Sequence, residues 1–165
     1  MFLYDKKPIL YCKTYTYLGC LIQENLDFRV TVGSLVDSAG RALGSIITKM
    51  IKNGGFPYSV FCTLYESCVS SISDYAGEVF GFNEFDAEMK LHLRAIRSFL
   101  GVSKSTAHSG LLSEFNILMP HYRTQLRMIR YYHRMLKCQT NVLAKKIFIW
   151  DRNLNKKQCS QVMAQ

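Results

Sequence analysis

The chain has 165 residues, of which 48% are hydrophobic and 20% charged, a composition that indicates one globular domain and excludes a disordered polypeptide. Its net charge of +9 arises in the second half: residues 1–83 hold seven Lys and Arg against seven Asp and Glu, and residues 84–165 hold fourteen against five. This asymmetry suggests a polyanionic partner, nucleic acid before membrane, and it leaves open, as an equal alternative, a basic surface without a dedicated partner.

Cysteine usage and hydropathy favour an intracellular protein. The six cysteines form no CxxC pair, and the N-terminus lacks the apolar core of a signal peptide. No apolar run reaches the ~18–20 residues needed to cross a bilayer. We therefore expect reduced thiols, a cytoplasmic or nuclear location or both, and no membrane contact.

The first 25 residues are the only part of the chain with strand character. Short aromatic and aliphatic runs surround the turn-like segment Asp5–Pro8, and a second such run, residues 15–22, contains Gly19, which is free to bend or bulge. We expect two or three short antiparallel strands. Because an isolated hairpin is marginally stable, it needs a partner to cover its apolar face.

Helical periodicity begins near residue 28, where apolar residues recur at intervals of three and four. Gly54 and Gly55 end the first helix, and Gly101 ends the third. Helices are expected over residues 28–52, 57–82 with a bend at Ser70 and Ser71, 84–100, 107–114, 120–138 and 142–151. Residues 153–165 are expected to be frayed. The predicted fold is mainly α, an N-terminal β-hairpin followed by a bundle of about five to six helices.

The clearest functional candidate is a basic stripe on the helix over residues 120–138. Its members recur at intervals of four, three, four and three: Arg123, Arg127, Arg130, Arg134 and Lys137. At 3.6 residues per turn they align over about 21 Å of helix axis. Because this helix contains no Asp or Glu, we predict phosphate contacts, the alternative being a solvated face balanced by acids elsewhere in the fold.

A second basic group lies on the preceding long helix. Lys90, Arg94 and Arg97 share one face of it, at intervals of four and three. Three such charges are common on ordinary helices, so these residues are weaker candidates for phosphate contact.

Catalytic and metal-site patterns are absent from the sequence. The four histidines have no HxxxH or HExxH spacing, no two cysteines lie at a zinc-ligand interval, and there is neither a glycine-rich phosphate loop nor an adjacent pair of aspartates. Asp74 and Glu78 are expected to be a pair on a helix surface. We predict no catalytic residue, metal ligand or cofactor in this chain.

Five segments succeed one another in a characteristic order. Residues 15–22 are Tyr-Thr-Tyr-Leu-Gly-Cys-Leu-Ile, and residues 39–44 are Ala-Gly-Arg-Ala-Leu-Gly. A run from Leu-Tyr-Glu-Ser-Cys-Val at residue 64 reaches Tyr-Ala-Gly-Glu-Val-Phe-Gly at residue 81, and two more segments lie at 94–102 and 118–130. In this order they resemble the region after the palm in reverse transcriptases of non-LTR (LINE-type) retrotransposons. Phe80 stands where that family usually has Trp.

The resemblance implies a domain organisation. It divides the chain into a primer-grip-like β-hairpin (1–25), a thumb-like helical region (26–102) and a basic helical region with a frayed C-terminus (103–165). Tyr15, Tyr17, Leu18 and Gly19 would form the primer-grip-like hairpin. The fingers, the catalytic Asp-Asp strand and its Mg²⁺ would lie upstream of Met1, so we expect this chain to be inactive alone.

The implied function is that of a fragment of an RNA-directed DNA polymerase. Such a fragment would bind the backbone of the template–primer, an RNA/DNA hybrid or duplex, next to the upstream palm and fingers of the same polyprotein. Three alternatives stay open: a protein–protein or assembly module that uses the exposed aromatic surfaces, an autonomous enzyme, and a gene remnant without function.

Overall fold

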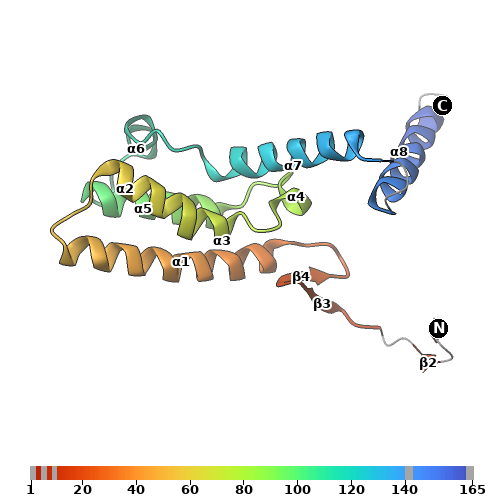
Figure 1. The fold of residues 1–165 in the computed structure, drawn as a ribbon, viewed down its shortest axis with the longest axis horizontal. Coiled ribbons are helices and arrows are strands. Elements are labelled where there is room, and N and C mark those ends of the chain that lie inside the picture. Colours follow the sequence, from red (N-terminus) through yellow and green to blue (C-terminus); the bar gives the residue numbers. More distant parts are fainter. Residues whose placement is uncertain (1–2, 5–6, 9–10, 140–142, 163–165) are drawn as a thin grey trace.

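The computed structural model describes the backbone of residues 3–4, 7–8, 11–139 and 143–162, and the side chains of residues 11–139 and 143–153. Within this part the protein is mainly helical, with short antiparallel strands at the N-terminal end (Figure 1). The predicted architecture is therefore confirmed. None of the described helices is both long enough and apolar enough to span a membrane.

The strands form two separate two-stranded antiparallel sheets. In the first, β1 (Leu3–Tyr4) pairs with β2 (Lys7–Pro8), and in the second, β3 (Thr14–Tyr17) pairs with β4 (Cys20–Gln23). The second hairpin turns at Leu18 and Gly19, which both have positive φ, 48° and 81°. A two-residue turn with positive φ at both positions matches the twist of the strands that it joins.

The helices come next in chain order, and one of them contains a π-helical segment, η1. Their bounds are α1 Arg29–Lys52, α2 Tyr58–Leu64, η1 Tyr65–Ser70, α3 Ser71–Ser73, α4 Gly77–Phe80, α5 Asp86–Leu100, α6 His108–Glu114, α7 Pro120–Lys137 and α8 Leu143–Val162.

The second predicted helix differs from the expectation in where it breaks. The backbone stays helical through Ser70 and Ser71, where the π segment passes into α3, and the helix ends only at Ser73. The break lies at Ala76, whose φ of 58° is left-handed. The next element is the single turn α4, not the helix expected up to residue 82.

The last helix is longer than predicted. α5 ends at Gly101, with φ 66°, as expected, but α8 runs to Val162 and not to Asp151. The sequence from Leu143 to Val162 contains neither Pro nor Gly, so no residue in it interrupts the helix. The expected helix end at Asp151 is therefore wrong, while the fraying expected from residue 153 stays a prediction.

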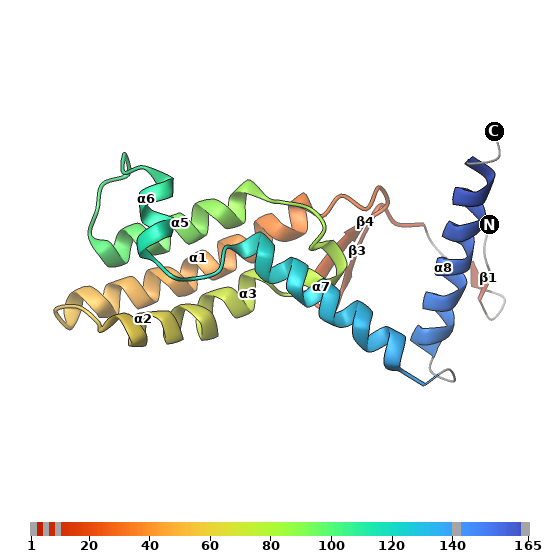
Figure 2. The ribbon, with the colours of Figure 1, turned by 90° about the horizontal axis from the view of Figure 1, so that it is seen from above.

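α1 packs against both other long elements of the helical body. Figure 2 shows α5 on one side of α1 and α2, η1 and α3 on the other. Their contact faces form one hydrophobic core that also includes α6. Within it the Phe61 and Phe99 rings lie 4.6 Å apart between centroids, and Phe115 packs edge-on against both.

α7 crosses α4 at close range. Cβ atoms added at Gly77 and Gly81 would lie 3.0 Å from the Thr124 side chain and 2.9 Å from its carbonyl oxygen, respectively. Only glycine at these two positions lets the helices approach this closely. The crossing fixes the direction in which the rest of α7 points (Figures 1 and 2).

Candidate nucleic-acid interface

The basic stripe belongs to α7, whose first residue is Pro120. Proline suits the first turn of a helix because its missing N–H has no helical partner there. The inward positions of α7 are Thr124, at the crossing with α4, and Met135 near the C-terminal end. The structure divides the five basic side chains into two groups with different surroundings.

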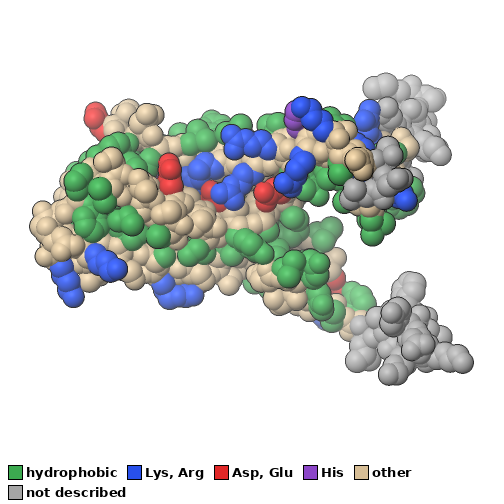
Figure 3. Space-filling model, viewed as in Figure 1, with side chains coloured by type: hydrophobic (Ala, Val, Ile, Leu, Met, Phe, Trp, Pro, Cys, Tyr) green, Lys and Arg blue, Asp and Glu red, His purple; other side chains and the backbone are tan. Residues whose placement is uncertain are grey.

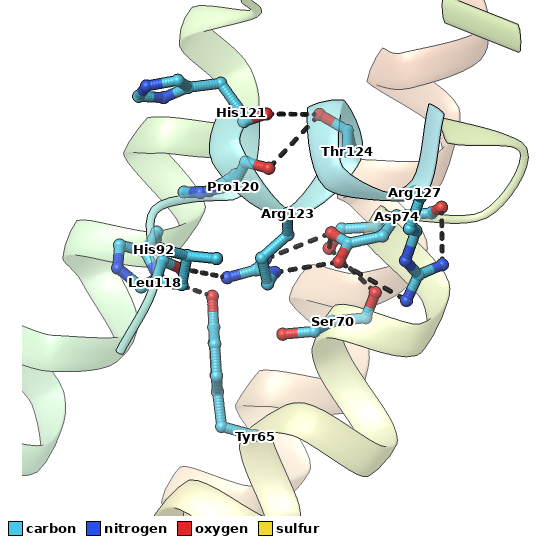
Figure 4. A network of polar contacts seen from close by, with 11 residues as sticks. Tyr65, Ser70, Asp74, His92, Leu118, Pro120, His121, Arg123, Thr124 and Arg127 are labelled. Atoms are coloured by element: carbon cyan, nitrogen blue, oxygen red, sulfur yellow. Dashed lines mark hydrogen bonds and ion pairs between the residues drawn. The ribbon is translucent and has the colours of Figure 1, made fainter. Parts of the chain in front are cut away.

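Arg123 is held by Asp74, a carboxylate with no exposed surface. Its Nε lies 2.9 Å from Oδ2 and its Nη2 lies 3.1 Å from Oδ1, so both carboxylate oxygens accept a hydrogen bond (Figure 4). The remaining nitrogen, Nη1, donates to the carbonyl oxygen of Leu118 at 2.7 Å. The whole guanidinium is therefore engaged by the protein itself.

Arg127 contacts the same aspartate from one helical turn further on. Its Nη1 donates to the backbone oxygen of Asp74 at 3.1 Å, and its Nη2 lies 3.7 Å from Oδ2. The Arg127 side chain remains 38% exposed. Asp74 thus joins the α3–α4 turn to α7, and the prediction that it forms a surface pair with Glu78 is wrong.

The charge of Arg123 is stable in this setting. Burial disfavours the charged guanidinium, but the hydrogen bonds and charge of Asp74 outweigh it, so the pKa of Arg123 is raised above its ordinary value. A phosphate group would have to compete with Asp74 for this side chain. Arg123 and, in part, Arg127 therefore anchor α7 to the rest of the protein.

The other three members of the stripe point to solvent. Arg130, Arg134 and Lys137 are exposed, and with His133 and Cys138 they line a surface hollow of about 470 Å³. None of the three forms an ion pair in the part of the chain that the structure describes. Figure 3 shows Lys and Arg side chains gathered along the upper edge of the molecule, over α7.

An aromatic ring supports one of these cations. The guanidinium carbon of Arg134 lies 5.2 Å from the centroid of the Tyr131 ring, within the range of a cation–π interaction. Both side chains lie at the surface. The exposed end of α7 therefore presents charge together with an aromatic plane, a combination that single-stranded nucleic-acid sites also use.

Lys145 closes the C-terminal end of α7. Its Nζ donates to the carbonyl oxygens of Met135 and Leu136, the latter at 2.7 Å, which have no partner inside the helix. The Tyr132 and Phe148 rings pack edge-on beside it, 5.4 Å apart. Sequence reasoning missed this role, because Lys145 belongs to the next helix, α8, and only the tertiary fold brings it to the end of α7.

The weaker candidates lie on α5, away from this surface. Lys90 and Arg94 are exposed, and Arg97 is half-buried, with its Nη2 donating to the backbone oxygen of Thr106 at 3.3 Å. In Figure 2 the C-terminal half of α7 extends away from α5. The structure therefore does not bring the two basic groups together into one surface.

The primer-grip-like residues lie at the tip of the second hairpin. Tyr15, Tyr17 and Leu18 are exposed, and Gly19 occupies the turn. The Tyr75 hydroxyl donates to the backbone oxygen of Leu18 at 2.6 Å and so connects this turn to the residue next to Asp74. The hairpin and the Asp74 anchor are therefore linked through adjacent residues.

A buried polar cluster lies beneath Arg123. The Tyr65 hydroxyl and Nδ1 of His92 are 2.9 Å apart, and Glu88, one helical turn before His92, is also buried. Burial, helped by the charge of Asp74, raises the pKa of Glu88 to about 7. Burial and the charge of Arg123 lower the pKa of His92 to about 4. Both groups are thus biased towards their neutral forms.

The described residues contain no group of three or more His, Cys, Asp and Glu side chains that could hold a metal ion. No protein-family model matches the chain, and no curated protein or solved structure matches it either. Any function assigned to the chain therefore rests on its own residues.

Proposed function

We propose that this chain binds the sugar–phosphate backbone of an RNA/DNA hybrid or duplex through the exposed half of α7, as the thumb and connecting region of a non-LTR reverse transcriptase. The observation that supports it best is the set of three exposed cations on α7, which have no acidic partner among the described residues. Arg130, Arg134 and Lys137 are the contact residues in this proposal.

The spacing of these cations suits a chain of phosphates. Arg130 and Lys137 are seven residues apart, or about 10.5 Å along a helix that rises 1.5 Å per residue. One strand of duplex DNA carries a charge every 3.4 Å or so along its axis, so this interval spans about three phosphates. Because α7 is anchored through Arg123, the exposed cations are held in position before they bind.

The family part of the proposal has separate support. It comes from the order of the motifs between residues 15 and 130, and from the hairpin that precedes the helices as that order requires. In such a polymerase the catalytic carboxylates and Mg²⁺ would belong to the palm, and this chain would hold the template–primer beside them.

The test compares two double variants that each remove two charges. Arg130→Gln with Arg134→Gln should weaken binding of a labelled hybrid and reduce the slope of log K against log salt by about 2, since each phosphate contact contributes about 0.9. The control is Lys49→Gln with Lys52→Gln, on exposed positions of α1 that do not line the hollow on α7. Fluorescence anisotropy at several salt concentrations measures both. Equal slopes for the two variants would refute the proposal.

A second candidate is a protein–protein module, favoured by the exposed apolar residues of the second hairpin. Tyr15 and Tyr17 are more than half exposed, and Leu18 at the turn is 73% exposed. Exposed apolar groups of this kind are typical of interfaces. Concentration-dependent sedimentation that Leu18→Ser abolishes, in a chain that binds no nucleic acid, would favour this function over the first.

A further inference from the structure

A second basic surface, separate from α7, lies along α5 and consists of two hollows that share Arg94. The first, of about 520 Å³, lies between α1 and α5 and has Arg41, Lys90 and Arg94 among its lining residues. The second, of about 800 Å³, lies at the C-terminal end of α5, where Arg97 and Lys104 join Arg94. We call the two hollows together the α5 groove.

The α5 groove has a strong excess of positive charge. Five cations line it, and Asp37 is the acidic residue among its lining side chains. None of the five forms an ion pair within the described residues. The partial negative charge at the end of α5, roughly half an elementary charge, is small beside three neighbouring cations. An anion in the groove would therefore meet an uncompensated positive potential.

The wall of the groove at the end of α5 is held in place before any ligand binds. Arg97 donates through Nη2 to the backbone oxygen of Thr106, and its own backbone oxygen accepts from the N–H of Val102 at 3.2 Å. The Thr106 N–H in turn donates to the backbone oxygen of Ser103 at 3.2 Å. These bonds close the loop that carries Lys104, so less ordering is left for a ligand to cause.

The length of the groove selects among anions. Lys90 and Arg97 are about 10.5 Å apart along α5, Lys104 extends the row beyond Arg97, and Arg41 flanks the row from α1. A single phosphate ion would neutralise only one end of such a row. A nucleic-acid strand, with a charge every 3.4 Å or so, matches its whole length.

We propose that the α5 groove binds the sugar–phosphate backbone of a second nucleic-acid segment, distinct from the one on α7. This second site rests on the proposed function only for the class of ligand, since its residues, loop and hollows are separate from those of α7. Arg94 is the central contact because it lines both hollows, and Lys104 binds at the far end. The chain would thus hold two segments of nucleic acid at once.

The test uses the double variant Arg94→Gln with Lys104→Gln, both at exposed positions, in the full chain. It is measured on a labelled 20-base-pair hybrid, in the wild-type background and in the Arg130→Gln, Arg134→Gln background. We expect the salt slope to fall by about 2 in both, so that the loss of affinity between 50 and 200 mM salt shrinks about tenfold. Lys49→Gln with Lys52→Gln is again the control.

A competition with inorganic pyrophosphate distinguishes a polymer site from a site for small phosphates. Pyrophosphate at up to 1 mM should leave the hybrid bound in the Arg130→Gln, Arg134→Gln background, and displacement there would overturn the proposal. A slope unchanged by Arg94→Gln with Lys104→Gln would also overturn it, even if α7 binds as proposed. A reduced slope for this pair alone would refute the function of α7 and leave the groove.

Discussion

At the scale of single residues, Asp74 is the centre of the structure's polar interior. It is fully buried and has two arginines from another helix around it. A buried carboxylate that loses its partners costs several kcal/mol, whereas an intact pair contributes far less to stability. The value of Asp74 therefore lies in specificity: it sets which turn of α7 meets the α3–α4 turn.

Glu88 and His92 give the stability of the protein two opposite dependences on pH. The pKa of Glu88 rises from 4.5 to about 7 on folding, so stability falls as pH increases between these values. The pKa of His92 falls from 6.5 to about 4, so stability falls as pH decreases from 6.5 to 4. Each slope is at most about 1.4 kcal/mol per pH unit, and between pH 4.5 and 6.5 the two oppose each other.

In each single variant, the free energy of unfolding should therefore show the pH dependence of the remaining group, which the other group offsets in the wild type. With Glu88→Gln, the free energy of unfolding should decrease as pH falls from 6.5 to 4, relative to wild type, because only His92 remains. With His92→Asn it should increase as pH falls from 7 to 4.5, because only Glu88 remains. Urea denaturation from pH 4 to 7.5 measures this, and the double variant supplies the background from all other groups. Slopes of the same sign in the two single variants would contradict the prediction.

At the scale of elements, the α4–α7 crossing depends on the absence of a side chain at Gly81. An added Cβ would lie 2.9 Å from the Thr124 carbonyl oxygen and closer still to the Gly77 carbonyl oxygen, so the backbone of α4 or α7 would have to shift. Gly81→Ala should therefore lower the free energy of unfolding by about 1–3 kcal/mol, as overpacking usually does. Gly44→Ala, where nothing lies within 4 Å inside α1, should instead raise it by about 0.5–1 kcal/mol. Urea denaturation gives both values, and an increase for Gly81→Ala as well would mean that the crossing has room for a side chain.

The elements also show what the sequence could predict. Local signals located the helix ends at Gly54 and Gly101 and the start of α7 at Pro120 correctly. The sequence did not predict the π segment, because inward residues four apart, such as Phe61, Tyr65 and Val69, are compatible with an α-helix and with a π-helix. Helical periodicity shows which face of a helix is buried, but it does not define the number of residues per turn closely enough to distinguish an α-helix from a π-helix.

The sequence predicted the candidate site only in part. The spacing of five cations places them on one side of α7, but only the tertiary crossing determines that Arg123 turns towards Asp74 while Arg130, Arg134 and Lys137 face solvent. Asp74 lies 49 residues before Arg123, so no local pattern connects them. The same holds for the α5 groove, whose Arg41 comes from α1.

At the scale of the whole molecule, the proposed function gives the positive charge of the second half two distinct uses. Part of it is neutralised internally and joins α7 to the helical body, and part of it remains exposed, on α7 and along α5. Under this proposal, the anchoring of α7 and the binding of nucleic acid are carried by neighbouring members of one sequence pattern. A single substitution in the stripe should therefore affect either stability or binding, depending on its position.

Arg123→Gln and Arg134→Gln separate these two uses, since each removes one charge from the same stripe. Arg123→Gln leaves buried Asp74 with Arg127 and the Ser73 hydroxyl as its side-chain partners, which should cost about 3–5 kcal/mol of stability, as breaking a buried ion pair does. Arg134→Gln at an exposed position should change stability by less than about 0.5 kcal/mol and reduce the salt slope of hybrid binding by about 1.

Urea denaturation measures the first effect, and anisotropy titration at a temperature where both variants are folded measures the second. At that temperature Arg123→Gln should keep the wild-type salt slope, because in the wild type the Arg123 guanidinium binds Asp74 and not phosphate. If Arg123→Gln instead lowers the slope by about 1 at unchanged stability, the Asp74 pair opens on binding. All five cations of the stripe would then reach the nucleic acid, and the division between anchor and interface would not hold.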